Sequence, residues 1–366
     1  MTKVSSCRAL GAADVASAAQ LACLLEASAP KPGNVSPGRH FADARYEDFL
    51  ASAVAIGEPL AGAGMRSVGA TVRLAVEATA RWTRSNTNLG IVLLLVPIAR
   101  AALWEKGDFT RIAESMRASG EELVQRLGIT KGLKVLDLGC GDGTTALPAA
   151  KLGADVLGVD IARNLVKAGN KRAAEHGLTD CTFQEGDASN LEQLPDKAFD
   201  LVISIFGAMF APKPFEVAKE MVRVTRPGGR IVMGNWIPND PTLVAQILKI
   251  SSSYTPPPPE GFVSPMTWGI ESNVMERFAR AGVPAEKISF ACDTFTFNFP
   301  GAPSAFVDEF RKYYGPTMNA FEAAEKNGRA ADLQRELEEL FASQNKSPSK
   351  DATSIPATFL RVTVAL

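Results

Sequence analysis

Three glycines fall within five positions of VLDLGCGDGTT, residues 135–145, directly after an apolar run. Gly139, Gly141 and Gly143 stand in the spacing GxGxG, where a strand is expected to give way to a helix. Glycine permits positive φ in a tight turn and lets the main chain approach a bound small molecule without an intervening Cβ. A glycine cluster alone is equally compatible with an ordinary turn, so its neighbours decide what it means.

Acidic residues stand at the ends of three successive predicted strands. Asp137 lies two residues before the glycines, Asp160 ends DVLGVD, and Asp187 follows TFQEG. A carboxylate about 20 residues beyond a glycine turn can accept hydrogen bonds from both hydroxyls of a ribose. Asp187 can accept from an exocyclic adenine amine, with Ala188 supplying a backbone N–H. Each acid alone can also be a helix cap or a solvated turn, but the three together predict a ligand at the carboxyl ends of the strands.

A parallel sheet is needed to position these residues, and its pattern begins at about residue 105. Short apolar runs alternate there with amphipathic segments, the runs being KVLDLG, DVLGVD, TFQEGD, DLVISIF and RIVMGNW. Nearly continuous apolar runs predict parallel strands buried on both faces, and right-handed crossovers wind them into one open sheet. Near the end, KISFACDTFTFNF and ATFLRVTVAL alternate and predict antiparallel edge strands.

The pieces VLDLGCGDG, GVDIA, EGDASNL, FDLVISIFGAMF and VRVTRPGGRIVM stand in the order of a known family. Over roughly 105–366 the chain resembles the class I S-adenosylmethionine-dependent methyltransferases, specifically those similar to ubiquinone/menaquinone-biosynthesis methyltransferases. The resemblance implies a doubly wound, mostly parallel, Rossmann-like α/β sheet with an antiparallel C-terminal edge strand. It also implies S-adenosyl-L-methionine as cofactor, with its methionine part on Asp137 and the glycine loop, its ribose on Asp160 and its adenine on Asp187. The cofactor-binding residues expected from it are Asp137, Gly139, Cys140, Gly141, Gly143, Asp160, Ile161, Asp187, Ala188 and Ser204.

No motif for a dedicated base is visible, so the catalytic residues stay unassigned. His176 in AAEHGL is expected to cap a helix, and Cys140 is expected to pack rather than to react. The protein then acts mainly by orienting and desolvating the reactants. Trp104 or Phe109 in WEKGDFTRIAE is expected to fold over the cofactor. A pocket for a small, fairly apolar acceptor is expected above the fourth and fifth strands, and ordinary core packing explains equally well the candidates for its walls, which are Phe206, Met209, Phe210, Trp236, Tyr254 and Trp268.

Residues 1–103 follow an all-helical pattern. Apolar residues recur at helical spacing in 13–27 and 68–82, and residues 89–103 predict a buried helix. The stretches KPGNVSPGRHFADARYEDFLASA and TRSNTNLGIVLLLVPIARAAL resemble the triphosphoribosyl-dephospho-CoA synthase family, which joins an ATP-derived triphosphoribosyl group to dephospho-CoA. Turns and caps explain equally well the residues that this resemblance implies for a vestigial phosphate or nucleotide site, which are Lys31, Asn34, Asn86 and Asn88.

The leader covers about a third of that family's length. We therefore expect a fusion of a truncated, non-catalytic leader, residues 1–103, to an intact methyltransferase domain, residues 104–366. A helical fragment that lacks its covering helices must dock on the second domain, pair with another copy, or stay partly molten. Leu89–Leu95 is the expected exposed face for such self-association.

Composition excludes several classes of protein. The 366 residues carry a formal net charge of −1, so nothing overall indicates a nucleic-acid partner. Five scattered cysteines and two histidines argue against a disulfide framework or a metal site and favour a reducing cytoplasm. No signal peptide is evident, and the most apolar stretch, Leu89–Leu103, is too short for a membrane span.

Several functions stay open at this point. The first is methyl transfer to a small-molecule acceptor whose identity and reacting atom the sequence does not define. The second is a bifunctional protein with a working triphosphoribosyl transferase, and the third is a non-catalytic cofactor-binding or interaction module. The GxGxG spacing and Asp187 argue against a fourth, a Rossmann dehydrogenase.

Overall fold

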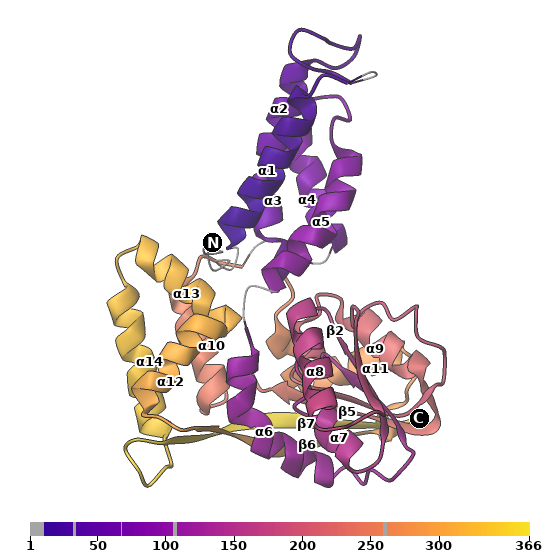
Figure 1. Cartoon of the computed structure of the whole chain (residues 1–366), viewed down its shortest axis with the longest axis vertical. Helices are drawn as coiled ribbons and strands as arrows, with labels where there is room; N and C mark the ends of the chain where they lie inside the picture. The colour runs from indigo at the N-terminus through magenta and orange to yellow at the C-terminus, as the bar shows by residue number, and fades with distance from the viewer. Residues whose placement is uncertain (1–10, 32–33, 67, 105–107, 259–261) are drawn as a thin grey trace. The chain divides into compact units, whose positions relative to one another are not determined.

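The computed structural model divides the chain into two compact units. One comprises Met1–Lys106 with Pro258–Val263, and the other Gly107–Pro257 with Ser264–Leu366 (Figure 1). The structure describes the whole chain apart from residues 1–10, 32–33, 67, 105–107 and 259–261. No helix of the described residues is both long and apolar enough to span a membrane.

Helices are the regular elements of the first unit in its described residues, as predicted, and loops and a single β-bridge between Ser36 and Arg39 connect them. Small residues at helical spacing form its contact surfaces: Thr71, Ala75 and Thr79 of α4 are all buried. Its elements are α1 (Ala12–Ser28), α2 (Tyr46–Ala55), α3 (Gly57–Ala61), the 3₁₀ turn η1 (Ala63–Met65), α4 (Val68–Ala80) and α5 (Leu89–Trp104).

The prediction of a buried helix over 89–103 is only half right. Val92 and Val96 of α5 are fully buried, but Leu93 and Leu94 are more than half exposed. Residues four apart share a helix face, so α5 packs one face into the unit's core and leaves another uncovered. The apolar run continues around the helix, which periodicity alone did not distinguish from full burial.

The second unit is built on a seven-stranded sheet in the order β3-β2-β1-β4-β5-β7-β6. The strands β1 to β5 are parallel to one another, and β7 is antiparallel to both its neighbours. The predicted doubly wound sheet with an antiparallel end is confirmed; within that end, β6 is the outermost strand. The strands are β1 (Lys134–Leu138), β2 (Asp155–Asp160), β3 (Cys181–Glu185), β4 (Phe199–Ile205), β5 (Thr225–Trp236), β6 (Ile288–Phe299) and β7 (Thr353–Ala365).

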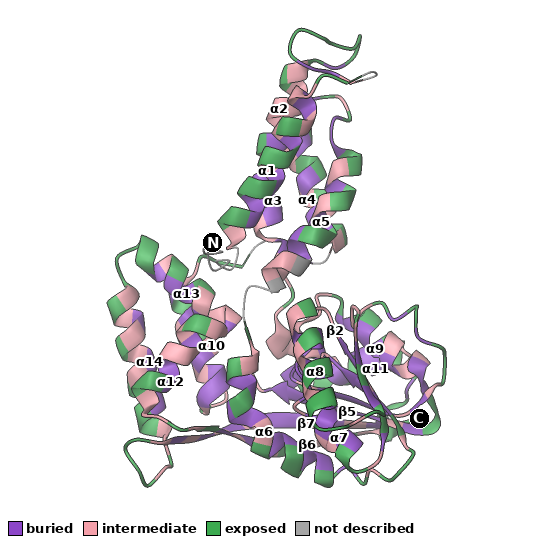
Figure 2. Cartoon of the chain, in the orientation of Figure 1, coloured by how far each residue is buried: buried purple, intermediate pink, exposed green. Residues whose placement is uncertain are grey.

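Helices cover both faces of the sheet, and the central strands β1 and β4 are largely buried, whereas the edge strand β6 is mostly not (Figure 2). One core joins the sheet to α7 (Ala146–Lys151), α8 (Arg163–Glu175) and the end of α6 (Thr110–Gln125). The larger core holds the side chains of α9 (Pro214–Val224), α11 (Glu271–Arg280) and the later helices. The remaining elements are η2 (Ala208–Phe210), α10 (Leu243–Tyr254), η3 (Pro265–Gly269), η4 (Ala285–Lys287), α12 (Pro303–Tyr313), α13 (Gly315–Lys326) and α14 (Ala330–Gln344).

β6 and β7 form a two-stranded ribbon that extends beyond the part of β7 that pairs with β5. β7 pairs with β5 only from Phe359 to Ala365, but its pairing with β6 begins at Thr353. The first half of β7 therefore runs past the end of β5 with β6 as its sheet neighbour, toward α12 and α14 (Figure 1). These helices and α13 all lie in the connection between β6 and β7.

The carboxyl ends of β1 and β4 meet through two glycines. A Cβ on Gly207, just after β4, would lie 2.1 Å from the carbonyl oxygen of Gly139. A Cβ on Gly139, whose φ is +69°, would lie 2.6 Å from the Gly207 Cα. The two main chains are thus in direct contact, and neither position has room for a side chain.

Gly207→Ala should destabilise the second unit by about 3 kcal/mol, because its methyl group meets rigid backbone rather than a movable side chain. Gly315→Ala is the matched control, since a Cβ there meets nothing within 4 Å. Urea unfolding of both variants measures the effect. Equal stability of the two variants would contradict the close approach.

Candidate functional site

The predicted glycine turn lies between β1 and α7. Gly139, Gly141 and Gly143 all have positive φ, as a tight turn requires. Gly141 differs from the other two because a Cβ on it would meet nothing within 4 Å. Its main chain therefore borders open space at the carboxyl edge of the sheet, where a ligand can approach the backbone.

Asp137 lies beneath this turn, with 1% of its surface exposed. The Thr145 hydroxyl donates to its Oδ2 over 2.5 Å. Burial raises the pKa of Asp137 to about 7, and the negative charge of Asp160 adds to the effect. The site thus holds a carboxyl group that exchanges its proton near neutral pH and is ready to accept a bond from a cationic or N–H group.

Asp160 ties the glycine turn to β2. Its Oδ2 accepts from the backbone N–H of Gly141 over 2.8 Å, and its Oδ1 accepts from that of Ala162 over 2.9 Å. Burial raises its pKa, although these backbone bonds oppose the shift. A carboxylate oxygen has two lone-pair directions, so both oxygens keep capacity for a further donor. Ile161, between Asp160 and Ala162, is partly buried at the same strand end.

Asp187 follows β3 at the next strand end. Its Oδ1 accepts from the N–H and the hydroxyl of Ser189, over 2.9 and 2.8 Å. These bonds form a local turn that holds the carboxylate and the partly buried Ala188 at the edge of the sheet. The structure therefore brings Asp137, Asp160 and Asp187 to one edge, on three adjacent strands.

Ser204 and Cys140 are buried and serve the framework of the site. The Ser204 hydroxyl donates to the Leu138 carbonyl over 2.7 Å and accepts from the Ala208 N–H over 3.0 Å. It thereby joins the ends of β1 and β4. Burial raises the thiol pKa of Cys140 well above its usual value, which keeps the sulfur protonated and poorly nucleophilic.

Asp142 is a site residue that the sequence analysis missed. It is 2% exposed, and its Oδ2 lies 2.8 Å from Arg117 Nη2 of α6 and 3.4 Å from Arg172 Nη1 of α8. Arg172 also donates to the Asp142 carbonyl over 2.6 Å. Two helices thus hold the middle of the glycine turn. The signal was an acidic residue inside a glycine run, but its partners lie 25 and 30 residues away in the sequence.

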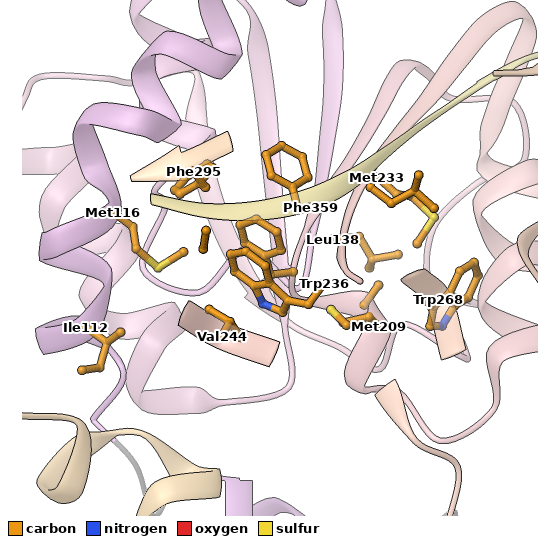
Figure 3. Close-up of a cluster of buried hydrophobic side chains, with 14 of the residues drawn as sticks. Ile112, Met116, Leu138, Met209, Met233, Trp236, Val244, Trp268, Phe295 and Phe359 are labelled. Carbon is orange, nitrogen blue, oxygen red and sulfur yellow. The ribbon is translucent and has the colours of Figure 1, made fainter. Parts of the chain in front are cut away.

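The residues expected to line the acceptor pocket belong to the hydrophobic core or pack against it (Figure 3). Core packing was the second interpretation that the sequence allowed for them. Phe206 and Trp236 stack with their ring centroids 3.7 Å apart, and Phe206 holds an unusual φ of +63°. Met209 and Trp268 are buried beside them, whereas Phe210 is only partly buried. Tyr254 is also buried, and its hydroxyl donates to Glu336 of α14 over 2.6 Å.

One buried polar residue among them was not predicted. Asn235 of β5 is 0% exposed, and neither amide atom has a hydrogen-bond partner in the structure. In the sequence, Asn235 is marked only by its polar side chain within the apolar run RIVMGNW.

Of the two residues expected to cover the cofactor, the structure describes the side chain of Phe109 only. The side chain of Trp104 lies outside the described residues. Phe109 precedes α6 and is partly buried, with its ring centroid 6.4 Å from that of Tyr314. His176 caps the end of α8, as predicted.

The leader residues fall into two separate groups. Lys31 pairs with Glu26 of α1 over 2.6 Å, and Asn34 donates to the Glu26 carbonyl. Asn86 accepts from the first backbone N–H of α5, and the buried Asn88 donates to a threonine hydroxyl of α4. Asn86 therefore caps α5, and Asn88 links α5 to α4. These are the roles in turns and caps that the sequence allowed for them.

A glycine turn and acids at the ends of adjacent parallel strands define a protein that binds a nucleotide-type cofactor. Residues 129–275 match the family described as "Methyltransferase domain", and residues 12–136 match "ATP:dephospho-CoA triphosphoribosyl transferase". The chain belongs to the S-adenosylmethionine-dependent methyltransferases and carries a triphosphoribosyl transferase segment at its N-terminus. Both resemblances inferred from the sequence are confirmed.

Two relatives illustrate the match. A Mycobacterium tuberculosis protein, "Uncharacterized protein Rv1403c", is 35% identical over 244 residues, which are 65% of this chain and 85% of that protein. The "Demethylmenaquinone methyltransferase" of Anoxybacillus flavithermus is 38% identical over 115 residues, which are 31% of this chain and 48% of that protein.

The buried carboxyl of Asp137 should make folding stability depend on pH. Its pKa is about 7 in the folded chain against an ordinary 3.8, so the folded state keeps a proton that the unfolded state loses. This contribution is fully present below about pH 4 and is lost as the pH rises through about 7, by up to ~4 kcal/mol. Asp137→Asn should therefore gain stability relative to the wild type over that range, as measured by urea unfolding. Asp155→Asn, at the exposed start of β2, is the control, and a pH-independent difference for Asp137→Asn would refute the assignment.

Proposed function

We propose that this protein transfers the methyl group of S-adenosylmethionine to a small, largely apolar molecule. The observation that carries the proposal is the hydrogen bond from the Gly141 N–H to Asp160, which joins the glycine turn to the next strand end. The open space at Gly141 and the acids on adjacent strands fit a cofactor that combines an amino acid, a ribose and an adenine.

The chain's own residues would bind and orient the two reactants. Asp137 and the glycine turn would hold the methionine part of the cofactor, Asp160 the ribose hydroxyls, and Asp187 with Ala188 the adenine. When bound, the cofactor supplies an electrophilic methyl group on a positively charged sulfur. Ser204 and Asp142 would position the site without contacting the cofactor. The hydrogen bond of Ser204 fixes the strand ends, and the ion pair of Asp142 fixes the glycine turn.

The apolar surroundings would exclude water from the reacting atoms. The stacked Phe206 and Trp236 lie directly after β4 and at the end of β5, beside the proposed cofactor site. Such an environment suits an acceptor with a large apolar part. The reaction then depends on alignment and desolvation rather than on a dedicated base.

The N-terminal segment is proposed to be non-catalytic. Lys31 and Asn34 bond to Glu26, whereas Asn86 and Asn88 serve the packing of α4 and α5. The apolar side chains exposed on α5 offer a surface for self-association instead.

Calorimetry with S-adenosylhomocysteine tests the cofactor site. Asp160→Ala should weaken binding by at least about tenfold, because both the ribose bonds and the anchor of the glycine turn are lost. Asp155→Ala, at the opposite end of the same strand, should leave the affinity unchanged. Equal affinities of the Asp160 variant and the wild type would refute the site.

Incubating the whole chain with ATP and dephospho-CoA tests the leader. We expect no release of adenine, measured by chromatography, because the four leader residues that could contact phosphate are occupied within the helical unit. Sustained adenine release that depends on dephospho-CoA would establish a bifunctional enzyme instead.

A further inference from the structure

Asn235 and Trp268 place unpaired polar atoms in the apolar core next to the proposed cofactor site. Asn235 is 0% exposed and Trp268 is 1% exposed. Neither amide atom of Asn235 nor Nε1 of Trp268 has a hydrogen-bond partner in the structure. Because the great majority of buried polar atoms in folded proteins are paired, such a combination calls for a partner from outside the chain.

The backbone brings these two residues to the same end of β5. Gly269, next to Trp268, lies so close to β5 that a Cβ on it would be 2.1 Å from the Trp236 carbonyl oxygen. Side chains alternate along a strand, so Asn235 shares the face of Met233, opposite to Trp236. Met233, Met209 and Trp268 lie together on one side of Trp236 in Figure 3.

This end of β5 is also the edge at which the cofactor is proposed to bind. β1, β4 and β5 run parallel, so their carboxyl ends lie at one edge of the sheet. Ser204, which bonds to the end of β1, pairs with Met233 two residues before Asn235. A molecule bound at Asn235 would therefore lie across β4 from the glycine turn.

A buried positive charge accompanies the unpaired atoms. The Arg277 guanidinium lies 4.4 Å from the Trp268 ring centroid, and its Nη2 donates to the Thr267 hydroxyl over 2.7 Å. Arg277 is 5% exposed, and burial lowers its pKa to about 10, a shift that the charge of Glu276 opposes. A buried cation favours an electron-rich oxygen nearby.

We propose that Asn235 and Trp268 bind the oxygen atoms of the methyl acceptor, and that the acceptor is a flat ring carrying a hydroxyl next to a carbonyl. This inference rests on the proposed function. The amide offers one acceptor and two donors, and the indole adds one donor. A hydroxyl bonds to Asn235 Oδ1, and a carbonyl oxygen accepts from Nδ2 and the indole N–H. Because both amide atoms are unpaired, this match holds whichever way the amide is oriented.

The surrounding side chains allow such a ring to enter. Met209 and Met233 are unbranched and adapt their shape readily to a ligand. Met209 lies in the three-residue turn η2, which follows Phe206 with its unusual positive φ. Entry of the ring would give the Asn235 amide the hydrogen bonds that it lacks within the chain.

Binding of naphthalene probes to the whole chain, saturated with S-adenosylhomocysteine, tests the proposal. The probes are 1-hydroxy-2-acetonaphthone, which has both oxygens, and 1-naphthol and 2-acetonaphthone, which have one each. The wild type should bind the first about tenfold more tightly than either of the others. Asn235→Leu should abolish that preference while leaving S-adenosylhomocysteine affinity within about twofold, and its melting temperature should rise because an unpaired amide is removed.

Two further variants make the result specific. Thr317→Val is the matched control, because Thr317 of α13 is also 0% exposed with an unpaired hydroxyl but lies outside the site. It should keep the preference, whereas Trp268→Phe should reduce it by about threefold.

The inference fails if the wild type binds the three probes equally, or if Asn235→Leu keeps the preference. A lower melting temperature of Asn235→Leu with unchanged probe binding would instead show an amide paired with an internal water, and would also overturn it. Both results leave S-adenosylhomocysteine binding intact, so they are distinct from a failure of the proposed function, in which that ligand does not bind.

Discussion

The contact between the main chains of Gly139 and Gly207 is the constraint on which the site depends. It fixes the carboxyl ends of β1 and β4 at a distance that permits no side chain on either. From this contact the chain turns through Gly141 and Gly143 on one side and enters η2 on the other. Asp160 and Asp142 then hold the turn from β2 and from the helices α6 and α8. The glycine turn is thus positioned by a backbone contact and by carboxylates of the chain rather than by flexible surface groups.

The sequence predicted the parts of this arrangement that depend on local pattern. Apolar runs predicted β1 to β5, and the acids directly after them could be placed at one edge because parallel strands end on the same side. The partners of Asp142 could not be predicted, since Arg117 and Arg172 approach it only through the packing of two helices. The burial of Phe206 and Trp236 was equally open, because an aromatic residue after a strand fits a pocket wall and a core alike. Asn235 carried only the signal of a polar residue in an apolar strand, and sequence alone does not show whether such an amide finds a partner.

The N-terminal unit, most of which matches the triphosphoribosyl transferase family, has a helical core of its own. Its core consists of small and β-branched residues such as Ala75, Val92 and Val96, which let short helices approach closely. Leu93 and Leu94 of α5 lie on the other side of the same helix and are exposed. The asparagines of SNTNLG take part in capping α5 and linking it to α4. A motif that resembles a nucleotide site thus contributes hydrogen bonds that stabilise the helices around it.

The long ribbon of β6 and β7 has two halves with different structural roles. Its inner half completes the sheet on which the glycine turn is built, while its outer half supports the α12–α14 connection away from β5. Lengthening a loop that two paired strands already close carries a small entropic penalty, which grows only logarithmically with its length. The connection can therefore change in length at little entropic cost, as long as its helices keep the core that they share with Phe206 and Trp236.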